Sequence, residues 1–442
     1  MNSVVRQLHE QNTDVVMVDT GNSYEGLCEY LGGKYISYTE EKPITMNPFK
    51  ISRNEYNIEK IDFLKNLILL IWKGSDAKIP EIEFRIVEQI IIDYYDAYFN
   101  GFTQYTDEQH EVLLKNLFAS ASRKNTNMPP KEVDEMVRKQ IEVLEKRRAA
   151  LKVTELSFNS FFDYSFDRLE QICTENDITT ISYSTYSTML QPFYKGGAYE
   201  KILNENVDST LFDETFIVFE VDAIKENKKL FPIVTLIIMD VFLQKMRIKK
   251  GRKALIIEEA WKAIASPTMA EYIKYLYKTV RKFHGIAGVV TQELNDVIDS
   301  PIVKEAIINN SDVKILLDQT KFKDRYEEIA DILGLTQVQR QQIFTINALN
   351  NHEGRSYFKE VWICRGTHSD VYGVEEAPEC YWAYTTERTE KEALKIYLRQ
   401  YGTIQEAITR IEADRKLDGG LKYLEFARKV NQQQKVMSLW KK

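Results

Sequence analysis

Residues 254–261 read ALIIEEAW, a run of apolar residues that ends in two adjacent glutamates, an alanine and a tryptophan. Such a run is typical of a buried β-strand. In a parallel sheet covered by helices, active residues lie at the carboxyl ends of strands, which is where Glu258 and Glu259 stand. One carboxylate can hold Mg²⁺ through water while the other orients or deprotonates an attacking water. A glutamate pair exposed at a strand end is also common without any function, so both interpretations stay open here.

The composition indicates an ordinary folded protein. At 442 residues the chain is long enough for two or three domains. Of these residues, 44% are hydrophobic and 28% charged. The 59 Lys+Arg against 66 Asp+Glu give a net charge of -7, so a broadly basic surface that coats nucleic acid is not indicated. The four cysteines are widely spaced, with no CxxC pair, which favours reduced thiols in a cytoplasmic protein. The apolar stretches at 67–72 and 231–242 are shorter than the roughly 18–20 residues of a membrane span.

The spacing of apolar residues divides the chain into four parts. Strands and helices alternate over 1–55 and again over 206–388, which predicts a parallel α/β sheet with both faces covered. Over 56–205, apolar residues recur three and four apart, which predicts an inserted all-helical domain. Residues 389–442 are predicted to form a C-terminal helical tail. The charged stretch at 120–155 is either a solvated helix or a partner-binding arm.

Two further residues near the glutamate pair could act with it. The strand predicted at 286–292 ends in Thr291 and Gln292. An amide at this strand tip could hydrogen-bond a γ-phosphate or the attacking water. Arg281 ends the preceding helix, where it could complement the helix dipole or reach a phosphate bound by a neighbouring subunit. Both interpretations of Arg281 stay open.

Together these motifs resemble the ATPase domain of conjugative type IV secretion motors, the TraG/TraC-type proteins of the HerA/FtsK-like P-loop superfamily. The family's acidic motif reads hydrophobic-hydrophobic-DEAW, and a helix end and a strand closing in TQ follow it, as in TVRKFHGIAGVVTQ at 279–292. The segment DVVMVDTGNSYEGLCEYLGGKYISY at 14–38, with MNPF at 46–49, is similar to the family segment that follows the phosphate loop. FIVFEVDAI at 216–224 resembles another family segment. The nearest type is TraG of Bacteroides-like conjugative transposons.

The resemblance implies a RecA-like P-loop ATPase with an inserted helical domain, working as a hexameric ring with ATP and Mg²⁺. It assigns Glu258 to magnesium and Glu259 to the attacking water. It assigns Gln292 to sensing the nucleotide and Arg281 to a neighbour's phosphate. Glu258 stands where the family usually has aspartate, so its carboxylate lies one methylene further out. The implied partners are type IV secretion or mating-pair components, at the cytoplasmic side of the inner membrane, with DNA contact possible and indirect.

The chain departs from the family at the phosphate loop. No GxxxxGK[ST] occurs in the 442 residues, and the nearest candidate, GGKY at 32–35, lacks the hydroxyl residue and precedes a strand. By the resemblance, the loop and the strand that feeds it would lie immediately before MNSVVRQL at 1–8. We therefore expect a truncated reading frame that binds ATP poorly. The two strands that border the missing one would carry unpaired backbone groups.

Three functions remain open from the sequence. The first is an ATPase motor that energises conjugative DNA transfer. The second is a non-hydrolysing interaction module of the secretion apparatus. The third is a DNA-pumping translocase of the same superfamily, which would be expected to carry a basic pore loop; the acidic net charge weighs against it.

Overall fold

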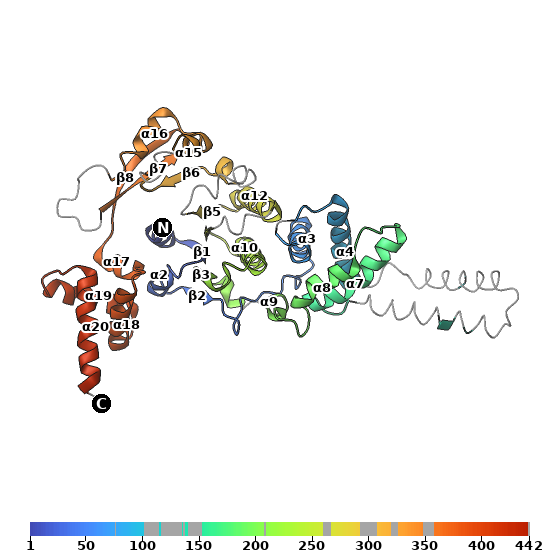
Figure 1. Ribbon diagram of the computed structural model, residues 1–442, viewed down its shortest axis with the longest axis horizontal. Coiled ribbons are helices and arrows are strands. Elements are labelled where there is room, and N and C mark those ends of the chain that lie inside the picture. Colours follow the sequence, from blue (N-terminus) through green and yellow to red (C-terminus); the bar gives the residue numbers. More distant parts are fainter. Residues whose placement is uncertain are drawn as a thin grey trace. The chain divides into compact units, whose positions relative to one another are not determined.

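The computed structural model describes residues 1–75, 77–100, 115, 135, 138–139, 153–206, 209–259, 267–291, 307–319, 326–347 and 358–440. These residues form two compact units (Figure 1). One unit combines Met1–Lys42 with Ser209–Lys442, and the other is Pro43–Asp208. The four-part division drawn from the sequence stays a prediction. Most of the charged stretch at 120–155 lies outside the described residues.

A five-stranded parallel sheet is the centre of the first unit (Figure 1). Its strands, in spatial order, are β2 (Lys34–Ser37), β3 (Phe216–Glu220), β1 (Thr13–Asp19), β4 (Arg252–Glu258) and β5 (Gly285–Val290). Every residue of β3 is buried, as are six of the seven residues of β1. Because successive side chains of a strand point to opposite faces, such strands need cover on both faces. The predicted parallel α/β sheet is therefore confirmed.

Helices supply this cover. On one face, α1 (Asn2–Glu10) and α2 (Glu25–Tyr30) share a buried cluster with alternate residues of β1, β3 and β4. The helix α10 (Leu230–Ile248) contacts β1 and β4, and α12 (Pro267–Lys282) packs on β5 and α10. Nearly every residue of α10 is buried, including Phe231, Val234, Ile238 and Val241, the face predicted from the sequence.

A smaller antiparallel sheet follows along the chain. It consists of β6 (Val313–Leu316), β7 (Phe358–Arg365) and β8 (His368–Glu375), packed against α15 (Tyr326–Leu333) and α16 (Gln337–Ile343). The strand predicted from VKILLD therefore pairs antiparallel with β7 and does not join the parallel sheet. Among the described residues, β5 pairs with β4 alone and β6 with β7 alone, so each presents an open edge.

The C-terminal helices belong to the same unit and pack against α2, one of the helices that cover the parallel sheet. They are α17 (Pro378–Tyr384), α18 (Arg388–Tyr401), α19 (Ile404–Leu417) and α20 (Tyr423–Trp440), which share a core around Trp382. Both α17 and α19 contact α2. A Cβ at Gly26 of α2 would lie 2.6 Å from the carbonyl oxygen of Ala383, so only glycine permits this approach.

Every described element of the second unit is helical, as the apolar spacing predicts. The elements are α3 (Ile58–Lys73), α4 (Glu81–Phe99), α7 (Phe158–Glu175), α8 (Tyr183–Leu190), the short 3₁₀ turn η1 (Gln191–Phe193) and α9 (Glu200–Asn204). The Asn57 side chain caps α3, and Ser157 with Ser160 forms a capping box at the start of α7. In the described parts of both units, no helix is long and apolar enough to cross a membrane.

Candidate functional site

Three neighbouring strands of the parallel sheet end in a carboxylate. Asp19 ends β1, Glu220 ends β3 and Glu258 ends β4. The register pairs Asp19 with Glu220, and it pairs Val18 with Ile257, the residue before Glu258. Asp19 is 0% exposed and Glu220 6% exposed, while Glu258 is partly buried. The strand-end site predicted at Glu258 is therefore one part of a wider carboxylate row, which we call the carboxyl edge: Asp19, Glu220, Glu258 and Glu259.

The loop between β1 and α2 folds around Asp19. The Asp19 carboxylate accepts hydrogen bonds from the backbone N–H groups of Gly21 (3.1 Å), Ser23 (2.9 Å) and Tyr24 (3.3 Å). Asn22 sits at the turn with a left-handed φ of 52°, a conformation that asparagine tolerates better than most residues. Burial raises the pKa of Asp19, although the three N–H donors act in the opposite direction. Asp19 thus holds the start of α2 against the end of β1.

Glu220 is held in a similar way at the end of β3. Its carboxylate accepts hydrogen bonds from the backbone N–H of Asp222 (2.8 Å) and the hydroxyl of Ser37 (3.1 Å). Burial raises the pKa of Glu220, and the nearby Asp19 carboxylate acts in the same direction. The carboxyl ends of β3 and β1 therefore place two acids of the same charge beside one another.

Glu258 accepts a hydrogen bond from the hydroxyl of Tyr24, which comes from the loop that Asp19 organises. Burial raises the pKa of Glu258, the bond from Tyr24 lowers it, and the Asp19 carboxylate raises it again. Met1, just before α1, lies close to Glu258. The amino end of α1 therefore lies near the carboxyl edge, and the first turn of a helix favours anions.

Glu259 follows β4 in an unusual backbone conformation. Its φ is 50°, in the left-handed region that costs a residue with a Cβ about 1–2 kcal/mol. Its N–H donates to the carbonyl of Val290 at 3.0 Å, so the residue stays attached to the end of β5. Strained backbone of this kind concentrates at functional sites. Glu259 lies at the same edge as Glu258, and its charge acts on that carboxylate.

Arg281 does not lie near the glutamate pair in its own chain. It ends α12, just before β5 begins, and Gly285 at the start of β5 pairs with Lys253 at the start of β4. Five strand steps separate that end from Glu258, on the order of 15–20 Å. The Arg281 side chain is 62% exposed, and its guanidinium donates two hydrogen bonds of 2.8 Å to Asp312. Contact with a neighbouring subunit stays a prediction.

Gln292 lies outside the described residues. The described chain ends there at Thr291, one residue beyond β5, whose last residue Val290 pairs with Glu258. The sequence analysis missed Asp19, Glu220 and Tyr24. The first two carry the same signal as Glu258, because each is a carboxylate that ends a buried apolar run.

The carboxyl edge is compatible with magnesium but has no complete metal cage. Among the described residues, no three His, Cys, Asp or Glu side chains lie close enough together to hold a metal ion. Mg²⁺ commonly keeps several waters and binds one or two carboxylates together with substrate phosphates. Glu258, beside the amino end of α1, fits that pattern.

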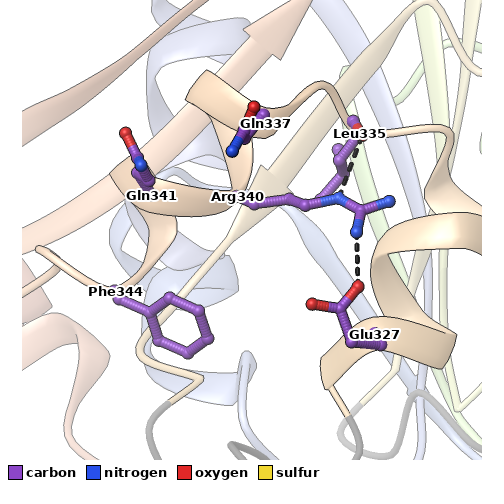
Figure 2. A pocket seen from close by; sticks show the side chains of 6 residues that line it. All are labelled: Glu327, Leu335, Gln337, Arg340, Gln341 and Phe344. Atoms are coloured by element: carbon purple, nitrogen blue, oxygen red, sulfur yellow. Dashed lines mark hydrogen bonds and ion pairs between the residues drawn. The ribbon is translucent and has the colours of Figure 1, made fainter.

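A surface pocket of about 500 Å³ lies elsewhere, between α15 and α16 (Figure 2). Its lining is Glu327, Leu335, Gln337, Arg340, Gln341 and Phe344. Arg340 points across it and binds Glu327, Asp331 (2.6 Å) and the carbonyl of Leu335 (3.2 Å). Two carboxylates already neutralise this guanidinium, so the pocket does not offer a ready anion site.

Comparison with known proteins places this geometry in context. A 149-residue segment is 27% identical to the type IV secretion system protein CagE of Helicobacter pylori (strain ATCC 700392 / 26695). That segment is 32% of this chain and 15% of CagE, so the chain matches only a small share of that relative. The structure of VirB4 of Thermoanaerobacter pseudethanolicus is similar with a TM-score of 0.55 and 18% identity, over 86% of each chain. The bacterial conjugative coupling protein TrwB gives a TM-score of 0.41 at 10% identity, over 85% of this chain and 81% of TrwB.

The likeness to VirB4 shows a RecA-like P-loop NTPase fold. The family described as the TraG P-loop domain matches residues 1–116 and 98–415, which is most of the sequence. The resemblance drawn from the acidic motif and its neighbours is thereby confirmed at the level of the family. This chain belongs to the TraG P-loop domain family.

Proposed function

We propose that this chain is the ATPase core of a motor that energises type IV secretion and conjugative DNA transfer. The observation that carries the proposal is the carboxyl edge, where three adjacent strand ends place carboxylates near the amino end of α1. Family membership and the similarity to CagE and VirB4 support it. The Bacteroides-type conjugative transposon is the setting that the motif resemblance favours.

Each residue of the site has a proposed role. Glu258 would hold Mg²⁺ through water, and Glu259 would orient or deprotonate the attacking water. Gln292 would sense the state of the nucleotide. Arg281 would exchange Asp312 for a phosphate bound by the next subunit of a hexameric ring. Bound MgATP supplies the phosphoryl group that is transferred to water.

We place the motor at the cytoplasmic face of the inner membrane, held there by secretion or mating-pair partners. Contact with DNA would be indirect. The charge balance supports this, because 66 Asp+Glu outnumber 59 Lys+Arg. Stimulation of hydrolysis by DNA would instead favour the translocase.

A second candidate is a non-hydrolysing interaction module of the secretion apparatus. The observation that favours it is the lack of any GxxxxGK[ST] in the 442 residues. Such a loop supplies the backbone N–H groups and the lysine that bind phosphates. Without them, the carboxyl edge could still serve a structural purpose.

Hydrolysis of ATP separates the two candidates. The experiment compares the 442-residue chain with a longer form that also carries the residues encoded in frame upstream of Met1. Thermal shift with and without MgATP measures nucleotide binding, and phosphate release measures hydrolysis. We expect the form with a phosphate loop to be stabilised by MgATP and to hydrolyse it. Glu259→Gln should lower kcat by about 10²–10⁴-fold, as expected when a general base is removed.

The matched control is Glu375→Gln, which changes an exposed glutamate at the end of β8 in the other sheet. It should leave kcat unchanged. If Glu259→Gln hydrolyses ATP as fast as this control, Glu259 is not the base. If no form binds or hydrolyses ATP, the interaction module becomes the better account.

A further inference from the structure

We propose that Tyr24 is a positioning residue for Glu258, and that its hydroxyl fixes the Glu258 carboxylate in the orientation that binds magnesium. The inference rests on the proposed function and adds to it a residue that none of the sequence motifs identified. Tyr24 would not touch the nucleotide, since it acts through Glu258.

The contact joins two distant parts of the sequence. The Tyr24 hydroxyl donates a hydrogen bond to Oε1 of Glu258, and the two residues are separated by 234 positions. Tyr24 is only 2% exposed and packs among the apolar residues between α2 and the sheet. A buried tyrosine places its ring in the core and needs a partner for its hydroxyl. Here that partner is the acid with the proposed role in binding magnesium.

The backbone of Tyr24 is fixed as firmly as its ring. Its N–H donates to the carboxylate of Asp19, which also accepts from Ser23 and Gly21. A continuous path therefore runs from the end of β1, through Asp19 and Tyr24, to the end of β4. Buried Asp19 therefore has a role in this path, because Asp19 anchors Tyr24, the residue that orients Glu258.

The orientation of Glu258 needs such a contact for two reasons. A glutamate carboxylate follows three rotatable bonds, so a strand end alone does not fix where it points. In addition, two acids act on it: Asp19 from the end of β1, and Glu259, which follows β4 directly. The Tyr24 hydroxyl gives the carboxylate a fixed hydrogen-bond donor against this repulsion.

The first test reads the contact in the 442-residue chain without any enzymatic assay. With 3-fluorotyrosine placed at position 24, the fluorine resonance should report the hydrogen bond that the hydroxyl donates to Glu258. At one pH, Glu258→Ala should shift this resonance because the acceptor is removed, whereas Glu375→Gln in the other sheet should leave it in place. An unshifted resonance in Glu258→Ala would overturn the proposal, whatever the protein does with ATP.

The second test reads positioning in the form that hydrolyses ATP. Tyr24→Phe removes only the hydroxyl, and we expect the Mg²⁺ concentration for half-maximal rate to rise on the order of tenfold, the usual worth of a hydrogen bond to a charged group. The KM for ATP should change little. The matched control is Tyr35→Phe, which removes a hydroxyl that donates to Asn22 of the same loop at 3.0 Å.

The outcomes separate this proposal from the proposed function. If Glu258→Gln abolishes hydrolysis while Tyr24→Phe behaves like Tyr35→Phe, the function stands and the positioning role is overturned. If the unaltered protein hydrolyses no ATP in any form, the proposed function fails. The fluorine resonance then decides alone whether Tyr24 holds Glu258.

Discussion

At the amino edge of the parallel sheet opposite charges meet, whereas at the carboxyl edge like charges lie side by side. The amino edge consists of Asp14 near the start of β1, Lys253 near the start of β4, and Lys245 of α10. Lys245 Nζ lies 3.4 Å from the Asp14 carboxylate and Lys253 Nζ 3.9 Å from it. Both lysine side chains are 1% exposed. Backbone carbonyls complete their hydrogen bonding.

The difference shows which edge has its charges balanced within the chain. At the amino edge, burial lowers the pKa of both lysines, and the Asp14 carboxylate opposes that effect. At the carboxyl edge, burial raises the pKa of Asp19, Glu220 and Glu258, and neighbouring acids add to the effect at Glu220 and Glu258. Opposite charges stabilise the folded chain without a ligand, whereas grouped acids become more favourable when a cation joins them. The comparison predicts different responses to substitution at the two edges.

The largest effect is expected at the amino edge, from Lys245→Met. Lys245 Nζ donates to the carbonyl oxygens of Phe212 (2.8 Å) and Glu214 (2.5 Å) as well as facing Asp14. Methionine fills similar space but leaves those buried acceptors without a donor. We expect the free energy of unfolding to fall by about 2–4 kcal/mol, measured by urea denaturation.

The matched control is Lys249→Met, four residues further on and directly after α10, where the lysine pairs with exposed Asp213. Exposed pairs contribute about 0–1 kcal/mol, so this change should scarcely alter the urea midpoint. Equal midpoints for Lys245→Met and the control would show that the amino edge is not held by these charges.

The same contrast explains what the sequence could and could not predict. The strand β4, the helix α10 and the position of Glu258 at a strand end follow from apolar spacing, which is a local property. The contact between Tyr24 and Glu258 depends on which strands become neighbours, and no local pattern encodes that pairing. Lys245 likewise looks like one polar residue on an apolar helix until α10 packs over β1 and β4.

The antiparallel sheet shows the same limit of prediction from sequence. The VKILLD segment reads as a buried strand from composition, yet β6 exposes alternate residues and pairs antiparallel with β7. A short apolar run predicts that a strand forms, but it does not predict which strand pairs with it. The positive φ of Glu259 was equally invisible, because nothing in the residue type requires it.

An intermediate effect is expected at the carboxyl edge, from Glu258→Gln, and with the opposite sign. Because the folded-state pKa of Glu258 is raised, its stabilising contribution is complete below the unfolded value near 4.5 and is lost as pH rises through the folded value. Glutamine has no such loss and can still accept the Tyr24 hydrogen bond.

We therefore expect Glu258→Gln to be more stable than the unaltered chain at pH 8, and the two to converge towards pH 4.5. Thermal melts across that range, without nucleotide or Mg²⁺, measure the difference. A variant that is less stable at pH 8 would show that the acids of this edge are already compensated within the chain.

The smallest effect is expected from relieving backbone strain, which exists at both edges. Glu259 at the carboxyl edge has a φ of 50°, and His284, in the turn before β5 at the amino edge, has a φ of 54°. Glycine adopts this conformation without a Cβ penalty, so Glu259→Gly and His284→Gly should each be more stable than the matching alanine variant, by about 0.5–1 kcal/mol. Thermal melts of the four variants test this. Only the substitutions at Glu259 should also abolish ATP hydrolysis, because at that edge the strained residue carries the proposed base. If His284→Gly also lost hydrolysis, the amino edge would matter for function as well as for stability. The separation that the charges of the two edges indicate would then be wrong.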